Sequence, residues 1–165
     1  MKKIIKPLLL ILLALLIIIQ FFHPAKNIHD QPTAVEKDIA TVYPYPDSVK
    51  QLLQSSCYDC HSNNTIYPWY SKLEPVDWWL NKHITEGKKE LNFNEFASYS
   101  LRKQYGKLKK IGDEVKSGGM PLSSYTLIHT YAKLDDKQKN IIINWANSVR
   151  DSMKNKYPAD SLIKK

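Results

Sequence analysis

The sequence predicts an all-α fold, because apolar residues recur at helical spacing and helix-capping residues flank these stretches. No stretch shows the apolar–polar alternation or the β-branched run that a strand requires. The chain has 165 residues and no internal repeat, so we expect one small helical domain. We place this domain at 44–157.

Residues 1–22 combine a lysine cluster with an unbroken apolar run over 8–19. A cleaved signal peptide and an uncleaved membrane anchor both have this pattern. No convincing small-x-small cleavage site follows the run, which favours a signal-anchor, that is, a single transmembrane segment. Under both interpretations the lysines stay in the cytoplasm and the remainder of the chain is exported.

Two flanking segments complete the expected organisation. Residues 23–43 are polar, are interrupted by prolines and show no periodicity, so they are predicted to be a semi-extended tether. Residues 158–165 are predicted to be a C-terminal tail.

The first expected helices of the domain cover 46–57 and 74–87. In the first, Asp47 is a candidate N-cap, and apolar residues at helical spacing lead directly to Cys57. In the second, Pro75 suits a first turn, and Gly87 is expected to end the helix.

Two further helical regions are expected at 92–119 and 134–154. The glycine pair at 118–119 is expected to end the former. The latter begins with Asp135 and has Gln138 three residues later, which is the pattern of a capping box. Long loops are expected at 62–73 and 118–134.

The net charge is +8, from 24 basic and 16 acidic residues, and basic residues concentrate at 101–116. A solvated helical face explains this concentration most simply. It could also be a docking surface for an acidic partner or for anionic lipid headgroups. No recognition motif for nucleic acid is present in a chain expected to be exported, so we expect no nucleic-acid partner.

Both cysteines of the chain lie in the motif Cys57-Tyr58-Asp59-Cys60-His61. A thioredoxin-like redox motif would need a βαβ context, and a structural zinc site would need two more ligands from scattered histidines. A disulfide would close a very short loop with little entropic gain. None of these alternatives explains the histidine.

Covalent attachment of haem c explains all three residues. The thiols of Cys57 and Cys60 would add to the two vinyl groups, and His61 would coordinate the iron on the proximal side. Met120 lies between a glycine pair and a proline and is the candidate distal ligand, which His83 and His129 could replace.

Four aromatic residues near the motif are candidates for the lining of the haem pocket. Their ordinary role would be core packing, which is compatible with a haem crevice. Their indole and phenol groups could also donate hydrogen bonds to haem propionates. The four residues are Tyr67, Trp69, Tyr70 and Trp79.

The segments CYDCHSNNTIYPWYSKLEPVDWWLNKHITEGKKELNFNEF, GGMPL and LDDKQKNIIINWA give the chain a specific resemblance. It resembles the bacterial haem-binding domain family, a cytochrome c-like group of short, membrane-tethered, exported proteins. The resemblance covers roughly Pro44 to Asn147, with Phe96 where the family would carry tryptophan. It implies a cytochrome c-like helical domain around one covalent haem, with Cys57, Cys60 and His61 binding it. Met120 lies where similar cytochromes c carry their distal methionine.

These features predict a membrane-tethered electron carrier rather than an enzyme. The expected partners are haem, the cytochrome c maturation machinery, unidentified redox proteins and the membrane. The expected location is the bacterial inner membrane, with the haem domain in the periplasm. An open sixth iron position would instead make the chain a haem enzyme or a gas or redox sensor. A zinc- or disulfide-stapled interaction module without haem is the remaining alternative.

Overall fold

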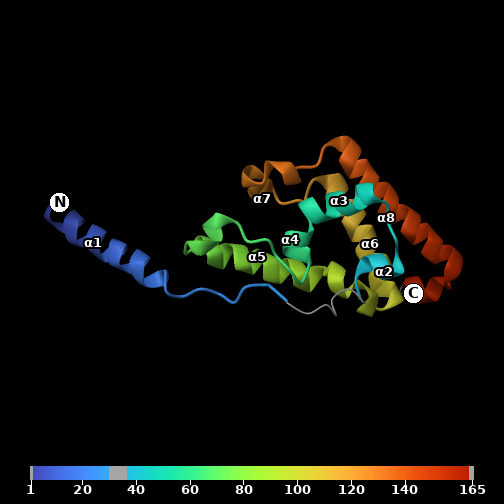
Figure 1. The fold of residues 1–165 in the computed structure, drawn as a ribbon, viewed down its shortest axis with the longest axis horizontal. Helices are drawn as coiled ribbons and strands as arrows, with labels where there is room; N and C mark the ends of the chain where they lie inside the picture. The colour runs from blue at the N-terminus through green and yellow to red at the C-terminus, as the bar shows by residue number, and fades with distance from the viewer. Residues whose placement is uncertain (1, 30–36, 164–165) are drawn as a thin grey trace.

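The structure, a computed structural model, describes residues 2–29 and 37–163 and contains no strand in these two ranges. The predicted all-α class is therefore confirmed. Figure 1 shows α1 extending away from a group of helices that contains both α3 and α8. In chain order the elements are α1 (Lys2–Ile19), α2 (Ile39–Val42), α3 (Asp47–Ser56), α4 (Tyr58–His61), η2 (Trp69–Lys72), α5 (Val76–Glu90), η3 (Phe93–Ser98), α6 (Leu101–Ser117), α7 (Ser123–Ile128), η4 (Thr130–Ala132), α8 (Asp136–Lys156) and α9 (Ala159–Leu162).

The main core lies where α6 packs against α8, with α3 and α9 beside them. The three longer helices, α3, α6 and α8, each have an apolar stripe at helical spacing, and burying the stripes together removes apolar surface from water. The side chains that become almost fully buried are Ile39, Val49, Leu53, Phe93, Phe96, Leu108, Ile142, Ala146 and Met153.

A second, smaller cluster lies between η2 and α5 and is built on Tyr70, Leu80 and Ile84. The Cys57–His61 motif connects the two clusters. Cys57 packs against the main core, and Cys60 packs against the smaller cluster. One turn of helix is therefore held from both sides.

The helix ends follow the sequence signals with three differences. Pro75, expected in a first turn, is instead the N-cap of α5. The capping box of Asp135 and Gln138 is present, and Gly118 ends α6 with a φ of 76°. Asp47 is the first residue of α3 rather than its N-cap, because Pro46 occupies the cap. The prediction that Gly87 ends its helix is wrong, since α5 continues to Glu90 and Leu91 N–H donates to the Gly87 carbonyl at 2.9 Å.

The N-terminal helix α1 has 18 residues and exposes its apolar side chains from Ile4 to Ile18. A membrane-spanning segment over 1–22 is not supported: among the described residues, no helix is both long enough and apolar enough to cross a lipid bilayer.

The segment expected to be a tether lies against the domain at both of its described ends. Asn27 N–H donates to the Tyr67 hydroxyl at 2.7 Å, and the Asn27 amide group donates to Thr65 Oγ1 at 2.9 Å. Farther along, Ile39 is completely buried in the main core. The expected tail also contributes to that core, through Leu162 of α9.

Candidate haem site

The Cys57–His61 motif forms a single helical turn between α3 and the loop that follows α4. The N–H groups of Cys60 and His61 both donate to the Cys57 carbonyl, at 3.2 and 3.0 Å. Because α3 ends one residue before Cys57, the main core fixes the start of this turn. Its three chemical groups, two thiols and one imidazole, come from one rigid unit.

The two cysteines are unpaired, so the structure contains no disulfide at this motif. Burial raises the pKa of Cys57 to about 12 and that of Cys60 to about 11. Thiols with such values are protonated at neutral pH and are poor metal ligands. Neither cysteine belongs to a cluster of three metal-ligating side chains in the described part of the chain, which weighs against a zinc site.

His61 is oriented by two backbone carbonyl groups of α5 and the residue after it. Its Nδ1 lies 2.9 Å from the Gly87 oxygen and 2.9 Å from the Leu91 oxygen. Since carbonyls only accept, the proton is on Nδ1, and Nε2 carries the lone pair. Nε2 makes no hydrogen bond within the described residues. Burial lowers the pKa of His61, which favours the neutral imidazole that metal coordination requires.

Gly87 explains how α5 comes so close to the motif. A Cβ at this position would lie 2.8 Å from the Cys60 carbonyl oxygen and 3.3 Å from Cys60 Cβ. A side chain would therefore push the helix away from the turn that carries His61. Glycine is required here for close approach, not for a helix end.

Two adjoining cavities open beside the motif. The α6 cavity, about 800 Å³ including space open to solvent, is lined by α6 residues such as Ile111 and Val115 and by Phe93. The α5–α7 cavity, about 880 Å³ on the same measure, is lined by residues such as His83 and Tyr125. The cavities share five lining residues: Ser56, Cys57, His61, Glu90 and Met120.

Met120 therefore lies on the same cavity walls as His61, although 59 positions separate them in the chain. The αL conformation of Gly118 turns the chain after α6, and Met120 N–H donates to the Glu114 carbonyl at 3.2 Å. The Met120 side chain remains partly exposed. Its thioether belongs to a short loop, whereas the imidazole of His61 belongs to a packed helical turn.

The two competing histidines differ in position. His83 lines the α5–α7 cavity, packs against Trp79 with ring centroids 4.3 Å apart and ring planes tilted by 49°, and places Nδ1 2.8 Å from the Trp79 carbonyl oxygen. His129 lines neither cavity. Its ring nitrogens are hydrogen-bonded to the hydroxyls of Tyr70 and Tyr131, at 2.8 and 2.9 Å. His83 is thus the histidine that the fold brings nearer to the motif's cavities.

The four aromatic residues singled out in the sequence lie around the smaller cluster and line neither cavity. Tyr70 is buried in this cluster, Tyr67 is partly buried against it, and Trp69 and Trp79 are 74% and 45% exposed. Cys60 packs against the same cluster. The prediction that they contact haem is left without support from this arrangement.

Other side chains, which pattern reading did not single out, line the cavities instead. Leu91 and Phe93 belong to the LNF segment that contributes to the family resemblance. This segment was the sequence feature that could have identified them as lining residues. Asp59, inside the motif, accepts a hydrogen bond from the Tyr125 hydroxyl at 2.6 Å and so fastens α7 beside the α5–α7 cavity. No local pattern relates two residues 66 positions apart.

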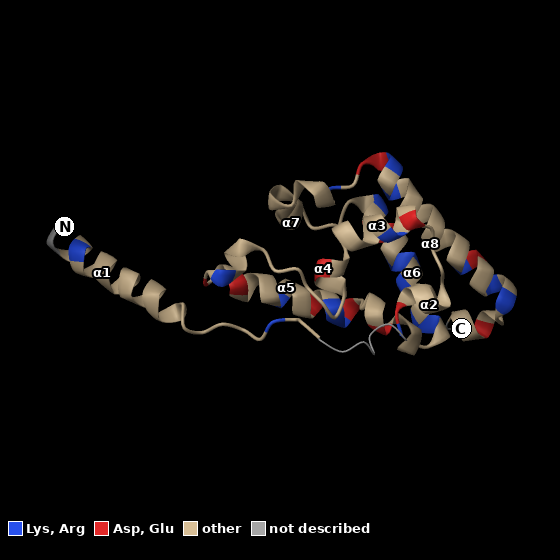
Figure 2. Ribbon diagram, viewed as in Figure 1, with Lys and Arg blue, Asp and Glu red and all other residues tan. Residues whose placement is uncertain are grey.

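Basic side chains border the α6 cavity. Figure 2 shows Lys and Arg along α6, and two of these residues, Lys107 and Lys110, line the cavity. Both approach Glu90 Oε2, at 3.3 and 3.9 Å. The rim therefore carries two cations paired with Glu90, and Glu114 also lines the cavity, beside apolar residues such as Ile111 and Val115.

These observations fit a haem group. His61 has one ring nitrogen fixed and the other unpartnered, two thiols lie on the same turn, and Met120 lies on the same cavity walls. Apolar side chains such as Ile111 and Phe93 supply a surface for the macrocycle.

Comparison with known proteins gives the same answer at the level of the family. The family described as a haem-binding domain matches residues 14–148, well over half of the chain. No curated protein and no solved structure matches it. The match includes the motif, both cavities and Met120. The chain belongs to the haem-binding domain family.

Proposed function

We propose that this protein is a c-type cytochrome that carries electrons, with one haem attached through Cys57 and Cys60. His61 would be the proximal iron ligand and Met120 the distal one. The observation that carries the proposal is the hydrogen bonding of His61, whose Nδ1 is held by two carbonyls while Nε2 stays available.

The protein's own residues would hold, orient and shield the group. The apolar wall of the α6 cavity would exclude water from one side. Lys107 and Lys110 would bind propionate carboxylates by exchanging them for Glu90, with which both lysines pair. Bound haem would supply one-electron redox chemistry, and a methionine ligand raises its reduction potential relative to histidine. With both axial positions filled by protein, no coordination site would remain for a substrate.

We also propose that the haem domain lies in the periplasm of a bacterium, on the inner membrane. The basic and apolar N-terminal sequence is typical of an export signal, and covalent attachment prevents loss of the cofactor outside the cytoplasm. The exposed apolar side chains of α1 would contact the membrane. Cell fractionation with the intact chain and with a variant starting at residue 23 would test this location.

Absorption spectroscopy of the full chain, expressed with a functioning cytochrome c maturation system, tests the haem proposal. We expect one haem that remains bound under denaturing conditions and is lost when Cys57 and Cys60 are both replaced by serine. We expect a low-spin spectrum with a methionine–iron charge-transfer band. That band should disappear in Met120→Ala and persist in the control Met153→Leu, because Met153 is buried in the main core.

Three other outcomes would contradict parts of the proposal. A high-spin spectrum that shifts readily with carbon monoxide would favour the enzyme or sensor alternative. Loss of the low-spin spectrum in His83→Ala, with Met120→Ala unchanged, would transfer the distal position to His83. Absence of covalent haem despite active maturation would contradict c-type attachment altogether.

A further inference from the structure

A charged cluster lies at the start of α5, apart from the two cavities. It consists of Glu74 and Asp77, whose carboxylates are 0% exposed, and of His23 and Lys26 from the segment that follows α1. Ionised carboxylates at such depth need compensating cations or hydrogen bonds. The partners of each oxygen therefore show what the cluster can bind.

Three of the four carboxylate oxygens have hydrogen-bond partners, and the fourth has none within the described residues. His23 Nδ1 lies 3.0 Å from Glu74 Oε1, Trp78 N–H donates to Glu74 Oε2 at 3.1 Å, and Lys26 Nζ donates to Asp77 Oδ1 at 2.6 Å. Asp77 Oδ2 is buried without a hydrogen-bond partner. Native proteins rarely leave such an atom unsatisfied, and a bound ion is one of the few explanations.

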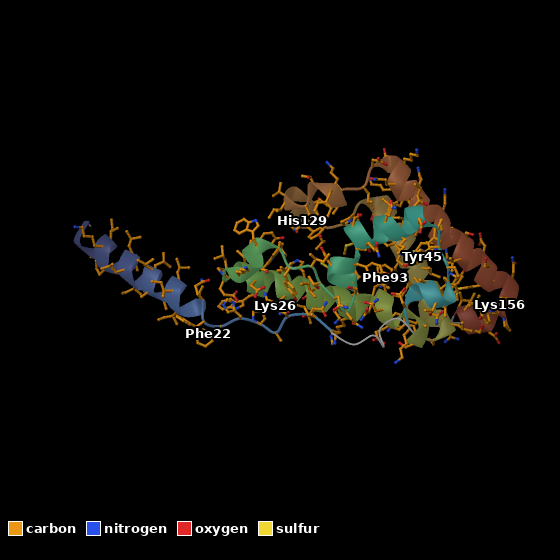
Figure 3. The ribbon with its side chains drawn as sticks, in the orientation of Figure 1. Phe22, Lys26, Tyr45, Phe93, His129 and Lys156 are labelled. Carbon is orange, nitrogen blue, oxygen red and sulfur yellow. The ribbon has the colours of Figure 1, made fainter. Side chains whose placement is uncertain are left out.

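The segment that carries His23 is fixed in place on both sides of the histidine. Gln20 donates to the Glu74 carbonyl and accepts from Glu74 N–H, both at 3.0 Å. Trp78 Nε1 donates to the Phe22 carbonyl at 2.7 Å. Figure 3 shows Phe22 at the end of α1 and Lys26 beside α5. His23 is thus presented to the carboxylates by several contacts that do not involve its own side chain.

We propose that His23, Glu74 and Asp77 bind one divalent transition-metal cation. One ligand atom from each residue lies within 4.8 Å of the other two. Ligand distances of about 2.0–2.2 Å would then need only modest contraction of the group. One imidazole and two carboxylates form a mixed nitrogen and oxygen donor set, which suits zinc and its neighbours better than magnesium or calcium.

The surroundings leave room for such an ion. The side chain of His23 is 46% exposed, so water can reach the cluster and complete the coordination. Lys26 occupies Asp77 Oδ1 and leaves Oδ2 as the donor. A purely ionic network of His23, Lys26, Glu74 and Asp77 would explain the observed contacts. It would not explain why Asp77 Oδ2 is buried without a hydrogen-bond partner among the described residues. The site would fasten the N-terminal segment to α5, independently of haem.

Zinc titration of the full-length, haem-loaded chain in detergent tests the proposal by calorimetry. We expect one saturable Zn²⁺ per chain, with affinity reduced about tenfold or more in His23→Ala, Glu74→Gln and Asp77→Asn. His29→Ala is the matched control, because its exposed side chain lies in the same segment outside the cluster, and it should bind as the parent does. Circular dichroism and the haem spectrum of each variant check that it is folded.

A second variant tests the arrangement without removing a ligand. Lys26→Met frees Asp77 Oδ1 and removes a neighbouring positive charge, so zinc should bind more tightly than in the parent. Absence of saturable zinc binding in the parent would overturn the proposal in favour of an ionic network. Equal binding in His23→Ala and the parent, or weaker binding in a folded Lys26→Met, would overturn it as well.

Discussion

The two candidate axial ligands contrast in how the fold holds them. His61 belongs to a helical turn between two apolar clusters, and two carbonyls fix its ring. Met120 belongs to a loop after α6, is partly exposed, and is held near the site by one backbone hydrogen bond to Glu114. A ligand fixed by many contacts is preorganised, whereas a loop ligand can adjust or be exchanged.

The contrast suggests that the turn carrying His61 and the loop carrying Met120 have different roles. We call them the rigid side and the loop side. Attachment of the cofactor would depend on the rigid side, where thiols and imidazole share one turn. The redox potential and access to the iron would depend on the loop side. Substitutions on the two sides should therefore differ in kind as well as in size.

Replacing the two ligands in turn gives the largest expected effect. In His61→Ala we expect the yield of correctly ligated, low-spin haem to fall by about tenfold or more, because loss of a ligand should exceed the usual cost of losing its supporting contacts. Met120→Ala should keep the covalent haem and change its spin state. Haem content per protein and the absorption spectrum measure both. A His61→Ala protein with the same absorption spectrum as the parent would contradict the role of His61 as the firmly held iron ligand.

The close contact at Gly87 gives the next effect. Gly87→Ala places a Cβ 2.8 Å from the Cys60 oxygen and should destabilise the chain by about 1–3 kcal/mol. The matched control is Gly112→Ala in α6, where nothing lies within 4 Å of the added Cβ and helix propensity should give about 0.5–1 kcal/mol of stabilisation. Denaturant unfolding measures both. Equal effects at the two glycines would show that the turn tolerates displacement.

The bond between Tyr125 and Asp59 tests how the loop side is attached. Tyr125→Phe removes a donor to a carboxylate and should cost roughly 1.5 kcal/mol. It should also make the iron more accessible to carbon monoxide, because α7 borders the α5–α7 cavity. Tyr131→Phe is the control, since Tyr131 is exposed, bonds His129 and makes no bond to Asp59 among the described residues, so this variant keeps the Tyr125–Asp59 bond. The rate of carbon monoxide binding distinguishes the two variants. Equal rates would show that α7 does not limit access to the iron.

The thiols of the haem-free chain give the smallest effect, which vanishes once haem is attached. Because burial raises the pKa of Cys60 to about 11 and that of Cys57 to about 12, both should alkylate more slowly at pH 7 than in the unfolded chain. Because the folded chain raises the thiol pKa values, it binds these protons more tightly than the unfolded chain does. The resulting contribution to folding stability is present below about pH 9 and is lost as the pH rises through 11 to 12. Alkylation followed by mass spectrometry measures the rates. Equal rates in the folded and unfolded chains would contradict the burial.

Parts of the fold were predictable because they depend on short stretches of chain. The helix starting after Asp135 and the end of α6 at Gly118 follow from capping and αL preference, which neighbouring residues decide. The extent of α5 was not predictable in this way. Gly87 has the same sequence signal whether it ends a helix or permits close approach, and only the proximity of Cys60 distinguishes these cases.

The site divides in the same manner. The all-α class and the chemistry of the motif follow from the sequence alone: helical periodicity is a local pattern, and the two thiols and the imidazole are neighbours in the chain. Three features follow from the packing of the folded chain. Carbonyls of Gly87 and Leu91 orient His61, Met120 rather than His129 lines its cavities, and His23 meets Glu74 and Asp77. These are contacts between residues far apart in the chain, and packing of whole helices sets them.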